Sequence, residues 1–275
     1  MNVHSIPARE QSAQCESVAR TPPPRLAPYV VGCSAFRAGG GTAVRHRLLP
    51  VNATVLIVDV TGADRLVTGA RGDYGIHATQ RWREGVTVGL TPAGTAALLG
   101  VPAREFVGAT VELADVLGRG REAELAERLA GEADAEARLG VVEAWVERRV
   151  EKRLGSRRGP GGGGDTVAVA AWRGLQRPGP RIPIPTLAAR LGVSRRYLEL
   201  GFAREIGMPP GRVARIARLQ HAVGRLADPS YDLAAIAAIC GYADQPHFTR
   251  DVRELTGLTP TALCANLQYR EPSAG

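Results

Sequence analysis

The chain has 275 residues, 44% of them hydrophobic, and a formal net charge of +8 at pH 7. That length predicts about two domains, and the charge favours an anionic partner. The chain has no long apolar run and no apolar segment near its N-terminus, which argues against a membrane span and a signal peptide. Its four cysteines form no Cys-x-x-Cys pair, which argues against a disulfide framework or a zinc module, so we expect a cytoplasmic protein.

The N-terminal part of the chain predicts a β-rich domain. Residues 1–21 are polar and irregular, and we expect them to be disordered. Residues 22–118 consist of short segments that are rich in β-branched residues and separated by glycines. Several short strands at this spacing predict a small antiparallel sheet, sandwich or barrel. The clearest strand candidates are Thr54–Val60, Arg65–Thr68 and Val86–Leu90.

Helical patterns follow the predicted strands. One helical turn is expected at Ala96–Gly100 and a helix at Asp115–Leu129, and residues 119–155 are expected to form a helical connector. Ala137–Leu154 carries an apolar stripe at helical spacing. Such a stripe packs either on its own sheet or against a second copy of the chain in a homodimer.

Residues 156–164 (SRRGPGGGG) form the clearest boundary in the chain. Four consecutive glycines cannot pack a core, so this linker is expected to behave as a flexible tether. After it, residues 165–268 predict an all-α domain. Asp165 stands where it can cap the first helix of that domain, TVAVAAWRGLQ.

The most informative stretch is Asp232–Pro260, which predicts two short helices joined by a glycine turn. Asp232 stands at an N-cap position and Gly241 where the first helix should stop. Asp244 then caps a second helix, predicted at residues 245–256, which has proline in its first turn. The inward positions of this second helix are Phe248, Val252 and Leu255.

A similar unit occurs earlier in the chain. A helix from Pro185 stops at Gly192, and Ser194 caps a second helix predicted at residues 195–206. Pro209–Ala227 joins the two units with one periodic apolar stripe, which predicts a single helix of about 27 Å. Two small helices on such a spacer can reach neighbouring major grooves of DNA, about 34 Å apart. Residues 181–270 also carry 12 arginines against 7 acidic residues, in keeping with phosphate neutralisation.

The outward residues of the two second helices are the candidate DNA-contacting residues, because in a helix-turn-helix the second helix lies in the major groove. Glutamine reads adenine, arginine reads guanine or holds a phosphate, and glutamate accepts from cytosine. The alternative is a pair of helical hairpins with solvated polar faces, since such hairpins are common. For His247 a second interpretation is support of the fold. The candidates are Arg195, Arg196 and Glu199 in the first unit, and Gln245, Pro246, His247, Thr249 and Arg250 in the second.

The segment GYADQPHFTRDVRELTGLTP, residues 241–260, resembles the C-terminal signature of the AraC/XylS family of transcriptional regulators. The resemblance implies an all-α domain with two helix-turn-helix units that binds double-stranded DNA, with RNA polymerase as a further partner. Val252 stands where the family usually has phenylalanine. The matching residues are Gly241, Tyr242, Gln245, His247, Phe248, Arg250, Gly257, Thr259 and Pro260.

The first unit resembles the same family through SRRYLE, residues 194–199, with one departure. The family often has arginine followed by an apolar residue directly after this glutamate, whereas Leu200 and Gly201 stand here. A glycine inside a helix costs about 1 kcal/mol relative to alanine, and an arginine base contact is missing. This half is therefore expected to read DNA more weakly or by shape. The alternative function that follows is an interaction or co-regulator module with weak DNA readout.

The N-terminal half resembles the sensor domain attached to some AraC-like regulators. The segments that carry this resemblance are LAPYV (26–30), HRLLP (46–50), TVLIVDV (54–60), VGLTPAGTAALLGVP (88–102) and VELADVLG (111–118). The resemblance implies that a signal, such as a small-molecule effector, changes how the DNA-binding domains are presented or how the polymerase is met.

An enzyme is the third and most distant alternative, as a β-barrel fused to a helical domain. His46 and His77 lie 31 residues apart without further ligand candidates, so no metal site is predicted. The glycine runs match neither a phosphate-binding loop nor a dinucleotide fingerprint. Cys33 is interpreted as a small buried residue rather than a reactive thiol. We therefore predict no enzyme, no catalytic residues and no cofactor.

Overall fold

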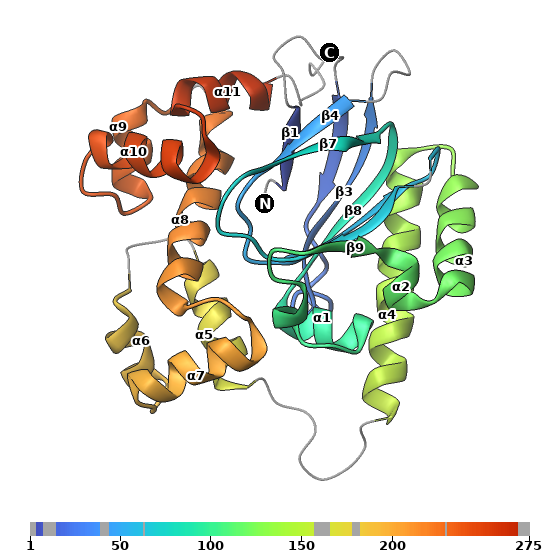
Figure 1. The fold of residues 1–275 in the computed structure, drawn as a ribbon, viewed down its shortest axis with the longest axis horizontal. Helices are drawn as coiled ribbons and strands as arrows, with labels where there is room; N and C mark the ends of the chain where they lie inside the picture. The colour runs from blue at the N-terminus through green and yellow to red at the C-terminus, as the bar shows by residue number, and fades with distance from the viewer. Residues whose placement is uncertain are drawn as a thin grey trace.

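The computed structural model describes residues 4–7, 15–38, 44–62, 64–156, 166–177, 182–228 and 230–268. An antiparallel β-rich half is followed by a helical half. The predicted order of a β-rich domain, connecting helices and an all-α domain, which is an α+β fold, is therefore confirmed. Figure 1 shows the sheets in the middle, with helices α2, α3 and α4 on one side and the helices of the C-terminal half on the other.

The described strands form two sheets in which every pair is antiparallel. The larger sheet has the order β2-β3-β8-β5-β6-β9 and the smaller one the order β1-β4-β7. In chain order the strands are β1 Ser5–Pro7, β2 Cys15–Arg20, β3 Val30–Ala38, β4 Val44–Leu48, β5 Thr54–Asp59, β6 Arg65–Thr68, β7 Gly75–Trp82, β8 Glu84–Leu90 and β9 Thr110–Glu112.

Strand β5 (TVLIVD) has six buried residues because both of its faces are covered. On one face Val55 and Ile57 pack with Trp82 of the smaller sheet. On the other face Leu56 and Val58 belong to the core formed with the helices. A strand buried on both sides needs apolar residues at consecutive positions, which explains why this strand could be predicted from the sequence.

Among the described residues, five helical segments follow or interrupt the strands, and they fill one side of the larger sheet. The predicted helix Asp115–Leu129 is two helices, because Gly118 adopts φ +86°, which breaks the helical path. The apolar stripe of α4 lies in the core with the sheet strands, so the first of its two alternatives, packing on its own sheet, is confirmed. The segments are α1 Pro92–Leu99, η2 Ala103–Phe106, α2 Leu113–Leu117, α3 Arg119–Ala130 and α4 Ala135–Ser156.

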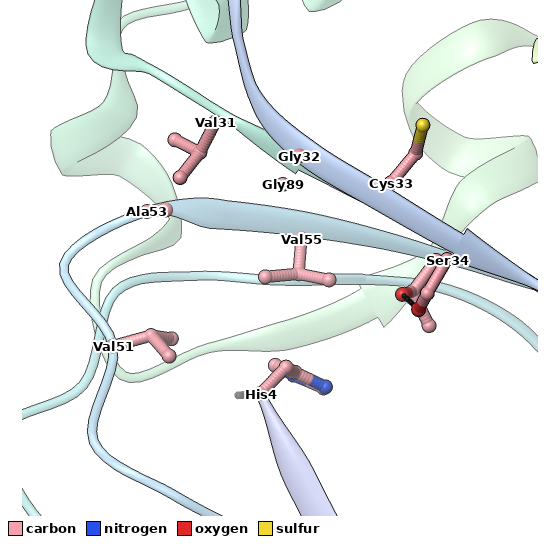
Figure 2. Close-up of a pocket in the computed structure, with 10 residues that line it drawn as sticks. His4, Val31, Gly32, Cys33, Ser34, Val51, Ala53, Val55 and Gly89 are labelled. Atoms are coloured by element: carbon pink, nitrogen blue, oxygen red, sulfur yellow. Dashed lines mark hydrogen bonds between the residues drawn. The ribbon is translucent and has the colours of Figure 1, made fainter. Parts of the chain in front are cut away.

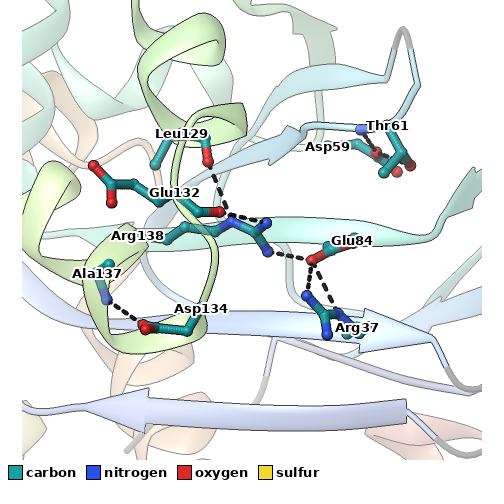
Figure 3. A network of polar contacts seen from close by, with 9 residues as sticks. All are labelled: Arg37, Asp59, Thr61, Glu84, Leu129, Glu132, Asp134, Ala137 and Arg138. Atoms are coloured by element: carbon teal, nitrogen blue, oxygen red, sulfur yellow. Dashed lines mark hydrogen bonds and ion pairs between the residues drawn. The ribbon is translucent and has the colours of Figure 1, made fainter.

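A polar network fixes α4 to the larger sheet (Figure 3). Arg138 is buried, and its guanidinium donates to the carbonyls of Leu129, at 3.2 Å, and Glu132, at 2.9 Å. It also pairs with Glu84 of β8, to which Arg37 donates at 2.5 Å. Burial acts to raise the pKa of Glu84, but the two guanidinium groups outweigh it and hold that pKa below its ordinary value.

The predicted disorder of residues 1–21 is wrong for two described segments. Ser5–Pro7 forms β1, and Cys15–Arg20 forms β2, which pairs with β3 from Cys15↔Ala38 to Arg20↔Cys33. Both strands are short and partly polar, so they carry little local signal. Their order comes from pairing with distant strands, which composition alone does not reveal.

The C-terminal half is helical throughout its described elements. Helix α5 is capped by Thr166, whose hydroxyl accepts from the Val169 N–H at 3.2 Å. The predicted cap, Asp165, and most of the predicted tether lie outside the described residues, while Ser156 is the last residue of α4. The helices are α5 Val167–Gln176, α6 Ile184–Arg190, α7 Arg195–Glu205, α8 Pro210–Leu226, α9 Leu233–Ile239, α10 Gln245–Thr256 and α11 Pro260–Gln268.

The two halves share buried contacts. The loop before β5 contributes Asn52, whose side chain donates to the Val213 carbonyl at 3.2 Å and whose own carbonyl accepts from the Trp172 indole at 3.0 Å. Gln220 of α8 donates to the Pro50 carbonyl at 2.7 Å. These donors are buried, so separating the halves without rehydrating them would leave polar groups unpaired. The linker therefore does not act alone in positioning the helical half.

Candidate functional site

The first helix-turn-helix unit is formed by α6 and α7. Gly192 stands in the turn with φ +70°, a left-handed conformation that glycine adopts without strain. Ser194 then caps α7, its hydroxyl accepting from the Tyr197 N–H at 3.1 Å. Leu198 and Phe202 turn inward, so the N-terminal turn of α7 is held out from the core.

The second unit, α9 and α10, repeats this arrangement. Asp232 caps α9 by accepting from the Ala235 N–H at 2.7 Å, and Asp244 caps α10 by accepting from the His247 N–H at 2.6 Å. Gly241 occupies the turn with φ +75°. The three caps and the two glycine turns predicted within these units are confirmed, so each second helix begins at a defined residue.

Helix α8 is the rod that joins the units, and each unit closes its core on a different part of it. Val213 and Ile216, in its first half, belong to the core of the first unit. Leu219 and Val223, in its second half, belong to the core of the second unit. At 17 residues the helix spans about 26 Å. The relative position of α7 and α10 is therefore set by one continuous helix.

A buried carboxylate fixes α10 to this rod. Asp251 is 6% exposed and accepts from Arg215 of α8 at 2.6 Å and from the Tyr242 hydroxyl at 3.0 Å. The guanidinium of Arg218 lies over the Tyr242 ring, 4.7 Å from its centroid. Burial raises the pKa of the Tyr242 hydroxyl, and the Asp251 carboxylate raises it further. The sequence prediction missed Asp251, although an aspartate beside the apolar stripe of a helix and two arginines on the neighbouring helix were available signals.

The candidate residues of the first unit lie on the surface. Arg195, Arg196 and Glu199 are exposed, and Arg195 pairs with Glu199 at 2.8 Å, one turn apart on the same helix. Ion pairs at the surface are weak, so Arg195 and Glu199 can separate to form hydrogen bonds with another molecule.

In the second unit Gln245, Pro246 and Arg250 are exposed, and His247 and Thr249 are half-buried. His247 accepts from the Ala243 N–H at 3.3 Å through Nδ1, and its ring meets the Tyr242 ring edge-on, with centroids 5.3 Å apart. His247 therefore holds the turn in place, which supports its second interpretation.

The departure at Leu200 and Gly201 has a structural explanation in one of its two residues. A Cβ on Gly201 would lie 3.2 Å from the Cβ of Ala168 in α5, tighter than ordinary packing allows. Gly201 therefore permits α7 to pack closely on α5. Leu200 is different, because its side chain is 60% exposed.

A groove with a volume of about 700 Å³ lies between the two units. It is lined by the ends of α5 and α9 together with parts of α6 and α8. Four arginines contribute to its wall, so this part of the surface suits an anionic ligand. They are Arg173, Arg177, Arg190 and Arg218.

The enzyme alternative gains no support from the described side chains. Burial raises the pKa of the Cys33 thiol to about 11, so the thiolate that reactive cysteines require is disfavoured. Within the described part of the chain no three His, Cys, Asp or Glu residues gather to hold a metal ion. The side chains of His46 and His77 lie outside the described residues. None of the described helices has the length and apolar character required to cross a bilayer.

Comparison with known proteins places residues 187–266 in a family described as "Helix-turn-helix domain". Over 79 residues, 29% of this chain, the chain is 35% identical to the F1 operon positive regulatory protein of Yersinia pestis and covers 26% of that protein. Over an equal span it is 34% identical to the HTH-type transcriptional regulator GbdR of Pseudomonas aeruginosa and covers 22% of it. The matched segment thus spans about a quarter of the length of these relatives.

Among solved structures, the apo form of a ToxT variant from Vibrio cholerae is similar over 94% of this chain and 100% of its own, with 11% identity and a TM-score of 0.45. Both sequence relatives are regulators by name. Residues 187–266, which the family model matches, contain α7, α8, α9 and α10. Residues 187–266 of this chain are therefore a helix-turn-helix domain, as the resemblance of residues 241–260 implied.

Proposed function

We propose that the protein is a sequence-specific DNA-binding transcriptional regulator that inserts α7 and α10 into neighbouring major grooves of one duplex. The observation that carries this proposal is the pair of capped second helices, each with an exposed first turn, whose cores close on a single helix. A helix-turn-helix reads bases through the N-terminal residues of its second helix. Those residues are the solvent-facing ones here.

The contacts divide by chemistry. Arg196 and Arg250 are exposed guanidinium groups that can read guanine or hold a phosphate, and Gln245 can read adenine. Glu199 can accept from cytosine once Arg195 releases it. Pro246 and Thr249 offer apolar contact to thymine, and His247 positions the turn. The arginine-lined groove between the units suits the phosphate backbone.

We further propose that the β-rich half passes a signal to the helical half through their shared contacts. Asn52 and Pro50, in one loop, hydrogen-bond to α5 and α8. A shift of that loop would therefore move α8, the helix that joins the two units. A cavity of about 40 Å³ lies behind this loop, lined by Val51, Ala53 and Val55 among others (Figure 2). That volume holds a few water molecules, so an organic effector would need the cavity to expand. Truncation of residues 1–155 should therefore change regulation in cells.

The second candidate function is an interaction or co-regulator module. The observation that favours it lies in the first unit, where Arg195 and Glu199 are paired with each other and Leu200 offers no polar group for base reading. Under this function the domain would keep its fold but discriminate poorly between duplexes. The homodimer, the contact with RNA polymerase and the cytoplasmic location remain expectations in either case.

A competitive binding experiment separates the two candidates. Full-length protein is used to select duplexes from a random pool, and affinities for selected and random duplexes are compared across a salt series. A regulator should prefer selected duplexes by at least about a thousandfold, with affinity that falls steeply as salt rises. Binding without such preference would reject the first function in favour of the second.

A further inference from the structure

An exposed apolar pair marks the first recognition helix. Tyr197 is 56% exposed and Leu200 is 60% exposed, and they lie three residues apart on α7. A single exposed leucine is ordinary on a protein surface. Two neighbouring exposed apolar side chains on the helix that the proposed function places against DNA are more informative. Only six large apolar side chains of the described residues are exposed.

Leu200 points directly away from the core. At 100° per residue, both Leu198 and Phe202, the buried residues of α7, lie about 160° around the helix axis from Leu200. The side chain therefore projects from the middle of the outward face. This is the part of the helix that would meet the floor of a groove.

The second unit carries a different residue at the same position. Counted from the caps Ser194 and Asp244, Leu200 and Arg250 are both the sixth residue. The buried residues two positions before and after Arg250 are Phe248 and Val252. Leu198 and Phe202 are buried at the same two positions around Leu200. The same position of the helix-turn-helix unit thus presents the isobutyl group of Leu200 to the first groove and the guanidinium group of Arg250 to the second.

The two chemistries match different features of the major groove. Arginine reads the acceptors of guanine, whereas an apolar side chain contacts the 5-methyl group of thymine, the one apolar group that the base edges present there. We propose that Leu200, flanked by Tyr197, is a specificity-determining residue that recognises thymine in the first DNA segment. This inference rests on the proposed function and adds the base that the first unit prefers.

Deoxyuridine tests it, because it differs from thymidine only by lacking the 5-methyl group. In the best selected duplex each thymidine is replaced singly by deoxyuridine, and the affinities of the wild type and of Leu200→Ala are measured at fixed salt. At one thymidine, about one helical turn from the guanine that Arg250 reads, the wild type should lose affinity about fourfold, the worth of one buried methyl group. Leu200→Ala should lose nothing further there. Val101→Ala, which trims an exposed apolar residue of the β-rich half, should respond like the wild type.

A change of preference is the second readout. When the selection is repeated with Leu200→Arg, guanine should replace that thymine in the recovered sequences. If no thymidine shows a methyl effect that depends on Leu200, or if Leu200→Arg recovers the wild-type sequence, the inference is wrong while DNA binding stands. If the wild type shows no preference for any duplex, the proposed function fails first. Leu200 is exposed, so neither variant should unfold, and circular dichroism checks this.

Discussion

The two helix-turn-helix units share one backbone plan but hold their second helices in place differently. In the second unit a buried carboxylate, Asp251, ties α10 to α8 through Arg215 and also accepts from Tyr242. Counted from the caps, its counterpart in the first unit is Gly201, which lets α7 pack against Ala168. The first unit thus relies on close apolar packing and the second on a polar network. The same recognition geometry does not require the same interactions behind it.

The largest expected effect comes from removing the carboxylate of the second unit. Asp251→Ala should lower the free energy of unfolding by about 3 kcal/mol, because it leaves Arg215 and the Tyr242 hydroxyl without their shared partner. Urea unfolding measures this. The matched control is Glu254→Ala, which removes the other carboxylate that pairs with Arg215 but is exposed, and it should have a much smaller effect. Equal losses would show that burial of Asp251 does not matter.

In the first unit the corresponding change is Gly201→Val. The new side chain would collide with Ala168 and push α7 away from α5, which should cost about 2 kcal/mol. The control is Gly224→Val on α8, where a Cβ meets nothing within 4 Å. The same urea measurement applies. A stable Gly201→Val protein with normal DNA affinity would contradict close packing as the support of the first unit.

Alkaline pH should weaken the second unit through Tyr242. Because its pKa is raised in the folded state, the hydroxyl stays protonated there while the unfolded chain ionises above its ordinary pKa of about 10. The stabilisation is therefore complete below pH 10 and is lost as pH rises toward the folded pKa. The loss of unfolding free energy caused by Tyr242 alone should reach about 1.4 kcal/mol per pH unit at most. Unfolding is measured between pH 8 and 11.5. Stability should fall more steeply with pH in the wild type than in Tyr242→Phe, which keeps the contribution of the buried Cys33 thiol.

The smallest expected effect concerns readout by the second unit. Arg250→Ala should weaken binding to a selected duplex by at least about 1 kcal/mol at fixed salt and relax preference at one base pair. Arg253→Ala, which removes another exposed arginine of α10, should leave base preference unchanged. A gel-shift titration measures the affinities for matched and mismatched duplexes. If Arg250→Ala discriminates between them as well as the wild type does, Arg250 does not read a base.

The sequence predicted the elements whose causes are local. Ser194, Asp232 and Asp244 cap helices because a short polar side chain directly before an apolar helical pattern can satisfy free N–H groups. Gly192 and Gly241 break helices because both adopt positive φ. Strand β5 was visible because both of its faces are buried.

What the sequence did not reveal depends on distant partners. Strands β1 and β2 acquire order by pairing with β4 and β3. Asn52 and Gln220 join the two halves by donating to backbone carbonyls. Every residue has a backbone carbonyl, so the residue type at the accepting position does not reveal the contact. The buried role of Asp251 likewise appears only when α8 lies beside α10.

The proposed function requires one stiff helix, α8, to place α7 and α10 in neighbouring major grooves on one face of a duplex. Methylation interference on a selected duplex tests it directly, since methyl groups on guanine N7 block entry to the major groove. We expect two interference patches about 10 base pairs apart, the first weakened in variants of α7 and the second in Arg250→Ala. A single patch, or two patches on opposite faces about half a turn apart, would contradict it.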